Sequence, residues 1–113
     1  MELKMPDLEE ISLELIIHGG NARAEAFEAL KAARAGLFDK AKEHLEKADS
    51  EIHAGHKKQT ALLQSDGEGA KAPANLLFVH AHGHLMTAMS EKSLIEELVI
   101  LYKKLNRDYL HFT

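Results

Sequence analysis

Three histidines lie close together in an apolar stretch of the chain, His80, His82 and His84. On a strand, all three side chains would share one face. On a helix, where successive residues turn by about 100°, only His80 and His84 share a face and His82 points away. Apolar residues continue at spacings of three and four, which predicts a helix with His80 and His84 one turn apart. These residues are Leu94, Ile95, Leu98, Leu101, Tyr102 and Leu105.

A pair of neighbouring imidazoles can serve three purposes. It can bind a metal ion such as Zn²⁺, although two nitrogens fill only half of a tetrahedral site. One imidazole can act as a nucleophile or proton carrier while the other shapes its surroundings, because a neutral imidazole has a free lone pair near pH 7. Both can also be ordinary polar residues at the seam of an oligomer. The spacing alone leaves all three roles open.

The composition is that of one globular domain rich in helix. The chain has 113 residues, of which 45% are hydrophobic, 28% charged and only 5% aromatic, and alanine and leucine dominate. It contains no cysteine, which excludes disulfides, thiol chemistry and cysteine-type zinc sites. The net charge of −4 gives no general attraction to nucleic acid or anionic lipid. No apolar stretch approaches the ~18 residues that span a bilayer, so we expect a cytoplasmic protein without direct membrane insertion.

The first predicted helix contains an adjacent pair of glycines. Asp7 fits a helix start, and apolar spacing continues to about Ala35, where Gly36 fits the position just after the helix. Gly19 and Gly20 interrupt the pattern and cost a helix roughly 2 kcal/mol relative to alanines. Either the helix breaks there, or the glycines allow a bend or a close approach of another backbone. Because the spacing resumes at once, we expect one long helix, bent or locally irregular at the glycines.

Two further helices complete the predicted fold. The second begins at Phe38 after a very short turn and reaches about Leu63. The third runs from about Ala74 to about Asn106, after a polar, glycine-rich loop. Short connections make antiparallel neighbours, so the predicted fold class is an all-α, antiparallel three-helix bundle.

The predicted helices are long for so small a domain. A helix of roughly 30 residues extends about 45 Å at ~1.5 Å per residue. So elongated a bundle gains by burying more surface against copies of itself, and we expect a homo-oligomer with closed symmetry. The single domain covers residues 7–106, and residues 1–6 and 107–113 are expected to be flexible or loosely docked ends.

Several motifs, in one order along the chain, resemble a single protein family. Residues 79–87, Val-His-Ala-His-Gly-His-Leu-Met-Thr, resemble the His-x-Gln-Asp-His-Leu-Met-Thr signature of the lactose/cellobiose-type (lactose/N,N'-diacetylchitobiose) IIA components of the bacterial phosphoenolpyruvate:sugar phosphotransferase system. Residues 17–23 resemble the family's Gly-(Asp/Asn/Gln)-Ala-Arg element, residues 29–38 its first turn, and residues 56–60 its His-x-x-Gln-Thr stretch. The resemblance spans roughly residues 7–105, and several motifs in register are far more specific than any one of them.

The resemblance implies a homotrimer of three-helix bundles that carries a phosphoryl group during sugar uptake. The group would arrive from the phosphohistidine of the general carrier HPr and leave to a cysteine of the cognate IIB, so the chain would be an enzyme of phosphoryl transfer. The family's phosphorylated histidine corresponds to His80, with Nε2 as the suggested reacting nitrogen. His84 would support it by donating a hydrogen bond to a phosphoryl oxygen. Gln59 and His56 are candidates for contacts to the same phosphoryl group, carried over from the family by motif alone.

Gly83 departs from the family pattern. The family usually has aspartate there, and three such carboxylates bind a divalent cation at the trimer axis. Glycine offers no carboxylate, so that site cannot be present in its usual form. His82 is the fallback ligand, for Zn²⁺ or Ni²⁺, but it lies about 100° around the helix from position 83. We therefore expect no metal at the axis and no required cofactor.

A different class of function also fits the histidines. The chain could be a histidine-rich metal-binding module, or a regulatory helical module that keeps the trimer without phosphoryl transfer. The change at position 83 leaves the nucleophile in place, so we expect phosphoryl transfer to survive. The sugar, of cellobiose, chitobiose or lactose type, stays open, because specificity belongs mainly to the membrane component of the system. The histidines of the alternative site are His53, His56, His80, His82 and His84.

Overall fold

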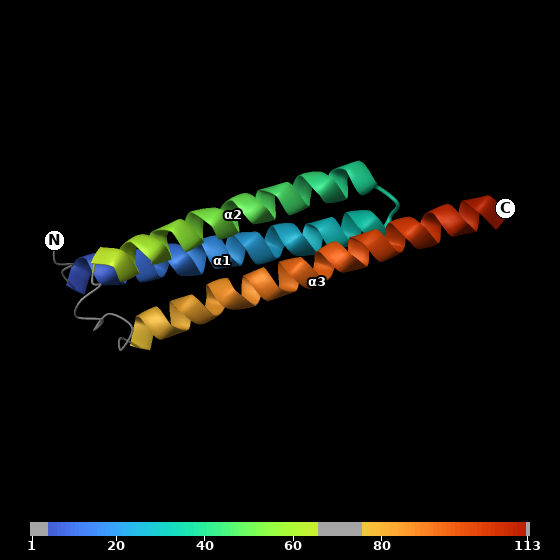
Figure 1. The fold of residues 1–113 in the computed structure, drawn as a ribbon. Helices are drawn as coiled ribbons and strands as arrows, with labels where there is room; N and C mark the ends of the chain where they lie inside the picture. Colours follow the sequence, from blue (N-terminus) through green and yellow to red (C-terminus); the bar gives the residue numbers. More distant parts are fainter. Residues whose placement is uncertain (1–4, 66–75, 113) are drawn as a thin grey trace.

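Three long helices lie side by side in an elongated bundle (Figure 1). The computed structural model describes residues 5–65 and 76–112, and in these ranges it contains α1 (Met5–Arg34), α2 (Phe38–Ser65) and α3 (Leu76–Phe112), with no strand. The helices run up, down and up, and the molecule measures 63 × 20 × 17 Å. α1 packs against both other helices over most of its length, whereas α2 and α3 touch each other much less. The predicted all-α, antiparallel three-helix bundle is confirmed.

The turn between α1 and α2 ends the first helix in the way its sequence predicts. Gly36 has a φ of 79°, a left-handed conformation that glycine adopts without steric cost. Its N–H donates to the carbonyl of Ala33 at 3.0 Å, and the N–H of Leu37 donates to the carbonyl of Ala32 at 2.8 Å. This pair of bonds is a Schellman motif, which satisfies the last carbonyls of α1 and lets α2 begin at Phe38.

The paired glycines do not interrupt α1. The helix is continuous through Gly19 and Gly20, which confirms the predicted single long helix. The alternative, close approach of another backbone, holds at Gly19. A Cβ built there would lie 3.1 Å from the carbonyl carbon and oxygen of His84 on α3. Helix packing at this crossing offsets the low helix propensity of glycine.

A second close contact holds the same stretch of α3 from the side of α2. A Cβ on Gly55 would lie 3.0 Å from Cδ1 of Leu85 and 3.3 Å from Cβ of His18. Leu85 is fully buried in this space. Glycines on α1 and α2 therefore let all three helices converge at His84 and Leu85.

The core consists of two apolar clusters, of which one lies beside the histidine pair. Phe78, Ala81 and Leu85 turn one face of α3 into this cluster, which leaves His80 and His84 on the neighbouring, outward face. The other cluster is rich in alanine, which lets the helix axes approach closely. The first cluster comprises Leu8, Leu15, Leu62, Phe78, Ala81 and Leu85; the second comprises Ala26, Ala29, Ala32, Ala33, Ala41, Ala48 and Ile95.

The helix ends differ from the predicted boundaries at both ends of the bundle. α1 begins at Met5, two residues before Asp7, and α3 continues to Phe112, six residues beyond Asn106. No glycine or proline follows Gly83, so nothing in the sequence stops the third helix. The predicted loop mostly lies outside the described residues, and the domain limits 7–106 stay a prediction. None of the three helices has the length and apolar run needed to cross a membrane.

Candidate functional site

His80 and His84 face each other on the outward side of α3. Their Nε2 atoms are 3.2 Å apart, and the rings meet edge to face with centroids 4.6 Å apart. At this distance the Nε2–H of one imidazole donates to the Nε2 lone pair of the other. The predicted pair, one helical turn apart, is confirmed. Of the two Nε2 atoms, one therefore acts as the hydrogen-bond acceptor.

The pair opens into a surface depression of about 290 Å³. Gly83 forms part of its wall, and a Cβ built on this residue would meet nothing within 4 Å. Within the residues that the structure describes, no packing contact therefore requires glycine at position 83. His80 is exposed in the single chain. The residues that line the depression are Arg23, Val79, His80, Gly83, His84 and Thr87.

Arg23 lines this depression from α1, and it is the one lysine or arginine among the described residues that line it. Its Nε pairs with Oε1 of Glu91 on α3, and its Nη2 donates to Oε2 of the same carboxylate at 3.2 Å. The motif around residue 23 matched the family, but it gave no sign of where the side chain lies. Arg23 was therefore not predicted as a site residue, although the Ala-Arg element contained it.

The structure shows what several residues of the motif at positions 17–23 of α1 contact. His18 donates from Nδ1 to Oε2 of Glu51 on α2 at 2.7 Å, and Asn21 donates from Nδ2 to the same oxygen at 3.4 Å. Gly19 lies against the backbone of His84, as described above. Arg23 lies one turn further on. Residues 18–23 thus join α1 to both α2 and α3, and they contact α3 at the backbone of His84.

Gln59 is bound to His82 and not to the histidine pair. The Nδ1–H of His82 donates to Oε1 of Gln59 at 2.8 Å, and the His82 ring stacks on Phe78 with centroids 6.2 Å apart. Gln59 is only 7% exposed. A buried amide of this kind needs a partner, and His82 supplies it. As predicted for a helix, His82 points away from His80, here toward α2.

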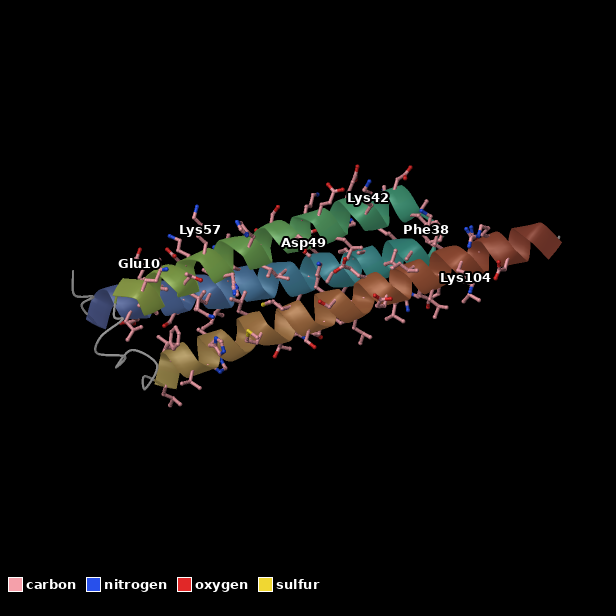
Figure 2. The ribbon with its side chains drawn as sticks, viewed as in Figure 1. Glu10, Phe38, Lys42, Asp49, Lys57 and Lys104 are labelled. Atoms are coloured by element: carbon pink, nitrogen blue, oxygen red, sulfur yellow. The ribbon has the colours of Figure 1, made fainter. Side chains whose placement is uncertain are left out.

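His56 lies apart from the other candidates within one chain. Together with His53 it lines a separate depression of about 630 Å³ on α2. Lys57, beside them, points away from α1 and α3 (Figure 2). The five histidines of the alternative module are thus spread over three places. Among the described residues no three metal-binding side chains gather, and the expectation of no metal at Gly83 stays a prediction.

Lys92 follows the site on α3 and ties this helix to α2. Its ammonium pairs with Asp49 on α2 and with Glu96 on α3. Partial burial lowers the pKa of Lys92, but the hydrogen bonds and negative charges of both carboxylates outweigh this effect and raise the pKa above its ordinary value. Lys92 is therefore charged at neutral pH. Its ion pair with Asp49 holds α3 against α2 at the position next to Glu91.

Known proteins resemble this chain over most of its length. The sequence model of the family described as "PTS system, Lactose/Cellobiose specific IIA subunit" matches residues 10–103. The chain is 40% identical over 99 residues to the lichenan-specific phosphotransferase enzyme IIA component of Bacillus subtilis, which covers 88% of this chain and 90% of the relative.

Two solved structures share its fold. The cellobiose-specific enzyme IIA of the phosphotransferase system from Bacillus anthracis has a TM-score of 0.83 and 39% identity, over 94% of this chain and 95% of that one. The chitobiose-specific IIA of Escherichia coli, solved in complex with HPr, has a TM-score of 0.79 and 40% identity, over 88% of this chain and 96% of that one.

Proposed function

The chain belongs to the lactose/cellobiose-specific IIA family of the phosphoenolpyruvate:sugar phosphotransferase system, and we propose that it is a cytoplasmic phosphocarrier whose His80 accepts the phosphoryl group. The observation that carries this proposal is the His80–His84 contact beside an open depression. An exposed imidazole with an oriented ring is a competent nucleophile for a phosphorus atom that another protein presents.

The transfer step follows from the tautomers of the pair. With a proton on Nε2 of His84 and another on Nδ1 of His80, His80 Nε2 carries no proton, and its lone pair becomes free to react when the hydrogen bond from His84 shifts to an oxygen of the incoming phosphoryl group. That lone pair forms a bond to phosphorus while the nitrogen–phosphorus bond of the donor breaks and its electron pair returns to the donor ring. The proton on His80 Nδ1 stays in place, so the step needs no general base.

His84 supports the step on both sides. Before transfer, its Nε2–H donates to His80 Nε2 and holds the acceptor ring in place. After transfer, that lone pair is used in the bond to phosphorus, and the same N–H donates to a phosphoryl oxygen. A donor placed where negative charge collects stabilises the phosphorylated form.

HPr is the proposed donor and a IIB cysteine the proposed acceptor. The structural neighbour from Escherichia coli, which was solved with HPr, supports the first partner. Onward transfer replaces the bond to His80 Nε2 with a bond between phosphorus and the deprotonated sulfur of the cysteine, and returns the lone pair to the imidazole. The relatives named for lichenan, cellobiose and chitobiose support a β-linked oligosaccharide as the sugar.

The proposed assembly is a homotrimer, and an apolar stripe on α3 supports it. Leu76, Val79 and Leu94 are 83%, 52% and 62% exposed, at positions that share one side of the helix. Gly83 lies within this stripe. Leu13 and Ile17 on α1 are also exposed, and copies of the chain would cover both surfaces.

The experiment is phosphorylation of the purified chain by phosphoenolpyruvate, enzyme I and HPr, followed by intact mass. We expect one phosphate per chain in the wild-type protein and none in His80→Ala, with the helical circular dichroism unchanged. His56→Ala is the matched control, since His56 lies in the separate depression on α2, and it should be phosphorylated normally. An unphosphorylated wild-type chain, or a phosphorylated His80→Ala chain, would contradict the proposal.

A further inference from the structure

A phosphoryl group on His80 would bring negative charge into the depression beside Arg23. The group carries close to two negative charges and three oxygen acceptors. His84 offers one N–H, which satisfies one of these oxygens. Among the residues that line the depression, Arg23 is the one that is always positively charged.

The contacts of Arg23 leave part of its guanidinium available. Of its five N–H groups, one on Nη2 donates to Oε2 of Glu91, and Nε forms an ion pair with Oε1 of the same carboxylate. The remaining three make no hydrogen bond to any part of the chain that the structure describes. The side chain is 45% exposed. Glu91 therefore holds one edge of the planar group and leaves the other edge open to a ligand.

We propose that Arg23 binds the phosphoryl group on His80 and that Glu91 is the positioning residue that orients it. This inference rests on the proposed phosphorylation of His80. A guanidinium matches phosphate oxygens with two parallel hydrogen bonds, which a single ammonium cannot do. The carboxylate of Glu91 also offsets part of the positive charge, which suits a carrier because the group must leave again.

Substitution of Arg23 should leave the fold intact. A half-exposed ion pair contributes only about 0–1 kcal/mol to stability. The pair Lys58–Glu14, 3.3 Å apart between α2 and α1, is of the same kind and lies away from the depression. Lys58→Gln is therefore the matched control for the loss of an exposed cation that joins two helices.

The test measures the initial rate at which phospho-HPr phosphorylates the full-length chain. We expect Arg23→Gln to lower this rate about tenfold or more, the scale for loss of one donor to a developing anion. Arg23→Lys should recover part of the rate, and Lys58→Gln should match the wild type. A rate in Arg23→Gln within twofold of the wild type would overturn the proposed role of Arg23. It would leave the proposed function in place, because the chain would still be phosphorylated.

Two further readouts separate phosphoryl binding from a structural effect. The ³¹P resonance of the phosphorylated protein should titrate at higher pH in Arg23→Gln, since loss of the guanidinium raises the pKa of the phosphoryl group. Glu91→Gln should slow transfer in the wild-type background and add nothing in the Arg23→Gln background. An unchanged titration, or additive losses in the double variant, would overturn the assignment. A wild-type chain that accepts no phosphate would instead overturn the proposed function and this inference with it.

Discussion

At the scale of single residues, the site depends on which ring nitrogens face each other. The contact between His80 and His84 joins Nε2 to Nε2, so in the proposed mechanism the N–H of His84 orients the His80 ring through a hydrogen bond to the nitrogen that would accept phosphorus. His82, between them, points toward α2 and satisfies buried Gln59. Of three histidines in five residues, two thus form the proposed site and the third maintains the bundle.

Replacement of His84 should separate its hydrogen bond from its bulk. We expect His84→Ala to lower the rate of phosphorylation about 10- to 100-fold, because the donor to the phosphoryl oxygen is lost. His84→Gln keeps an N–H near the same place and should retain more of the rate. The measurement is the initial rate with phospho-HPr for both variants. Equal rates in His84→Ala and the wild type would remove His84 from the mechanism.

At the scale of the helices, two glycines that are adjacent in sequence have opposite roles. Gly19 is buried against the backbone of His84, and a Cβ would lie 3.1 Å from it. Gly20 is exposed, and a Cβ there would meet nothing within 4 Å. The crossing of α1 and α3 therefore depends on Gly19, and through it the position of the histidine pair.

Alanine at each glycine gives a matched test. We expect Gly19→Ala to lower the free energy of unfolding by about 1–3 kcal/mol, the cost of overpacking a close contact. Gly20→Ala should raise it by about 0.4–1 kcal/mol, because alanine reduces the entropy of the unfolded chain. Urea unfolding at one protein concentration measures both. A stabilising Gly19→Ala would mean that the two helices separate without cost.

The sequence predicted the elements better than their contacts. Apolar spacing and Gly36 were enough to predict three helices and the first turn, because both signals are local. The same spacing could not choose between a bend at Gly19 and a close approach of α3, since that choice depends on a residue 65 positions later in the chain, at His84. The same distinction holds for the site. The His80–His84 pair could be predicted because it is local, whereas the Arg23–Glu91 and His82–Gln59 contacts could not, because they join different helices.

At the scale of the whole molecule, the bundle is narrow and leaves apolar side chains uncovered. The outer face of α2 carries charged residues such as Lys42 and Lys57 (Figure 2), whereas α3 exposes Leu76, Val79 and Leu94. This asymmetry favours self-association through α3 and leaves the charged face of α2 in solvent. The proposed trimer would place copies of the stripe, and of Gly83, close to one another.

A charge within the stripe tests this arrangement. We expect Leu94→Glu to dissociate the proposed trimer, because three carboxylates would meet in an apolar contact. Lys57→Glu on the outer face of α2 should leave the assembly unchanged. Sedimentation velocity gives the mass of each variant. A monomeric wild-type chain, or a Leu94→Glu variant of unchanged mass, would refute the proposed interface.

The central claim is that Nε2 of His80 carries the phosphoryl group. The most direct measurement is a long-range ¹H–¹⁵N spectrum of the histidine rings in the ¹⁵N-labelled chain, before and after phosphorylation by HPr. We predict that the Nε2 signal of His80 moves to the position of a phosphorylated nitrogen, with a smaller change at His84 and none at His53 or His56. A phosphorylated nitrogen on any other histidine, or no change in His80, would contradict the account.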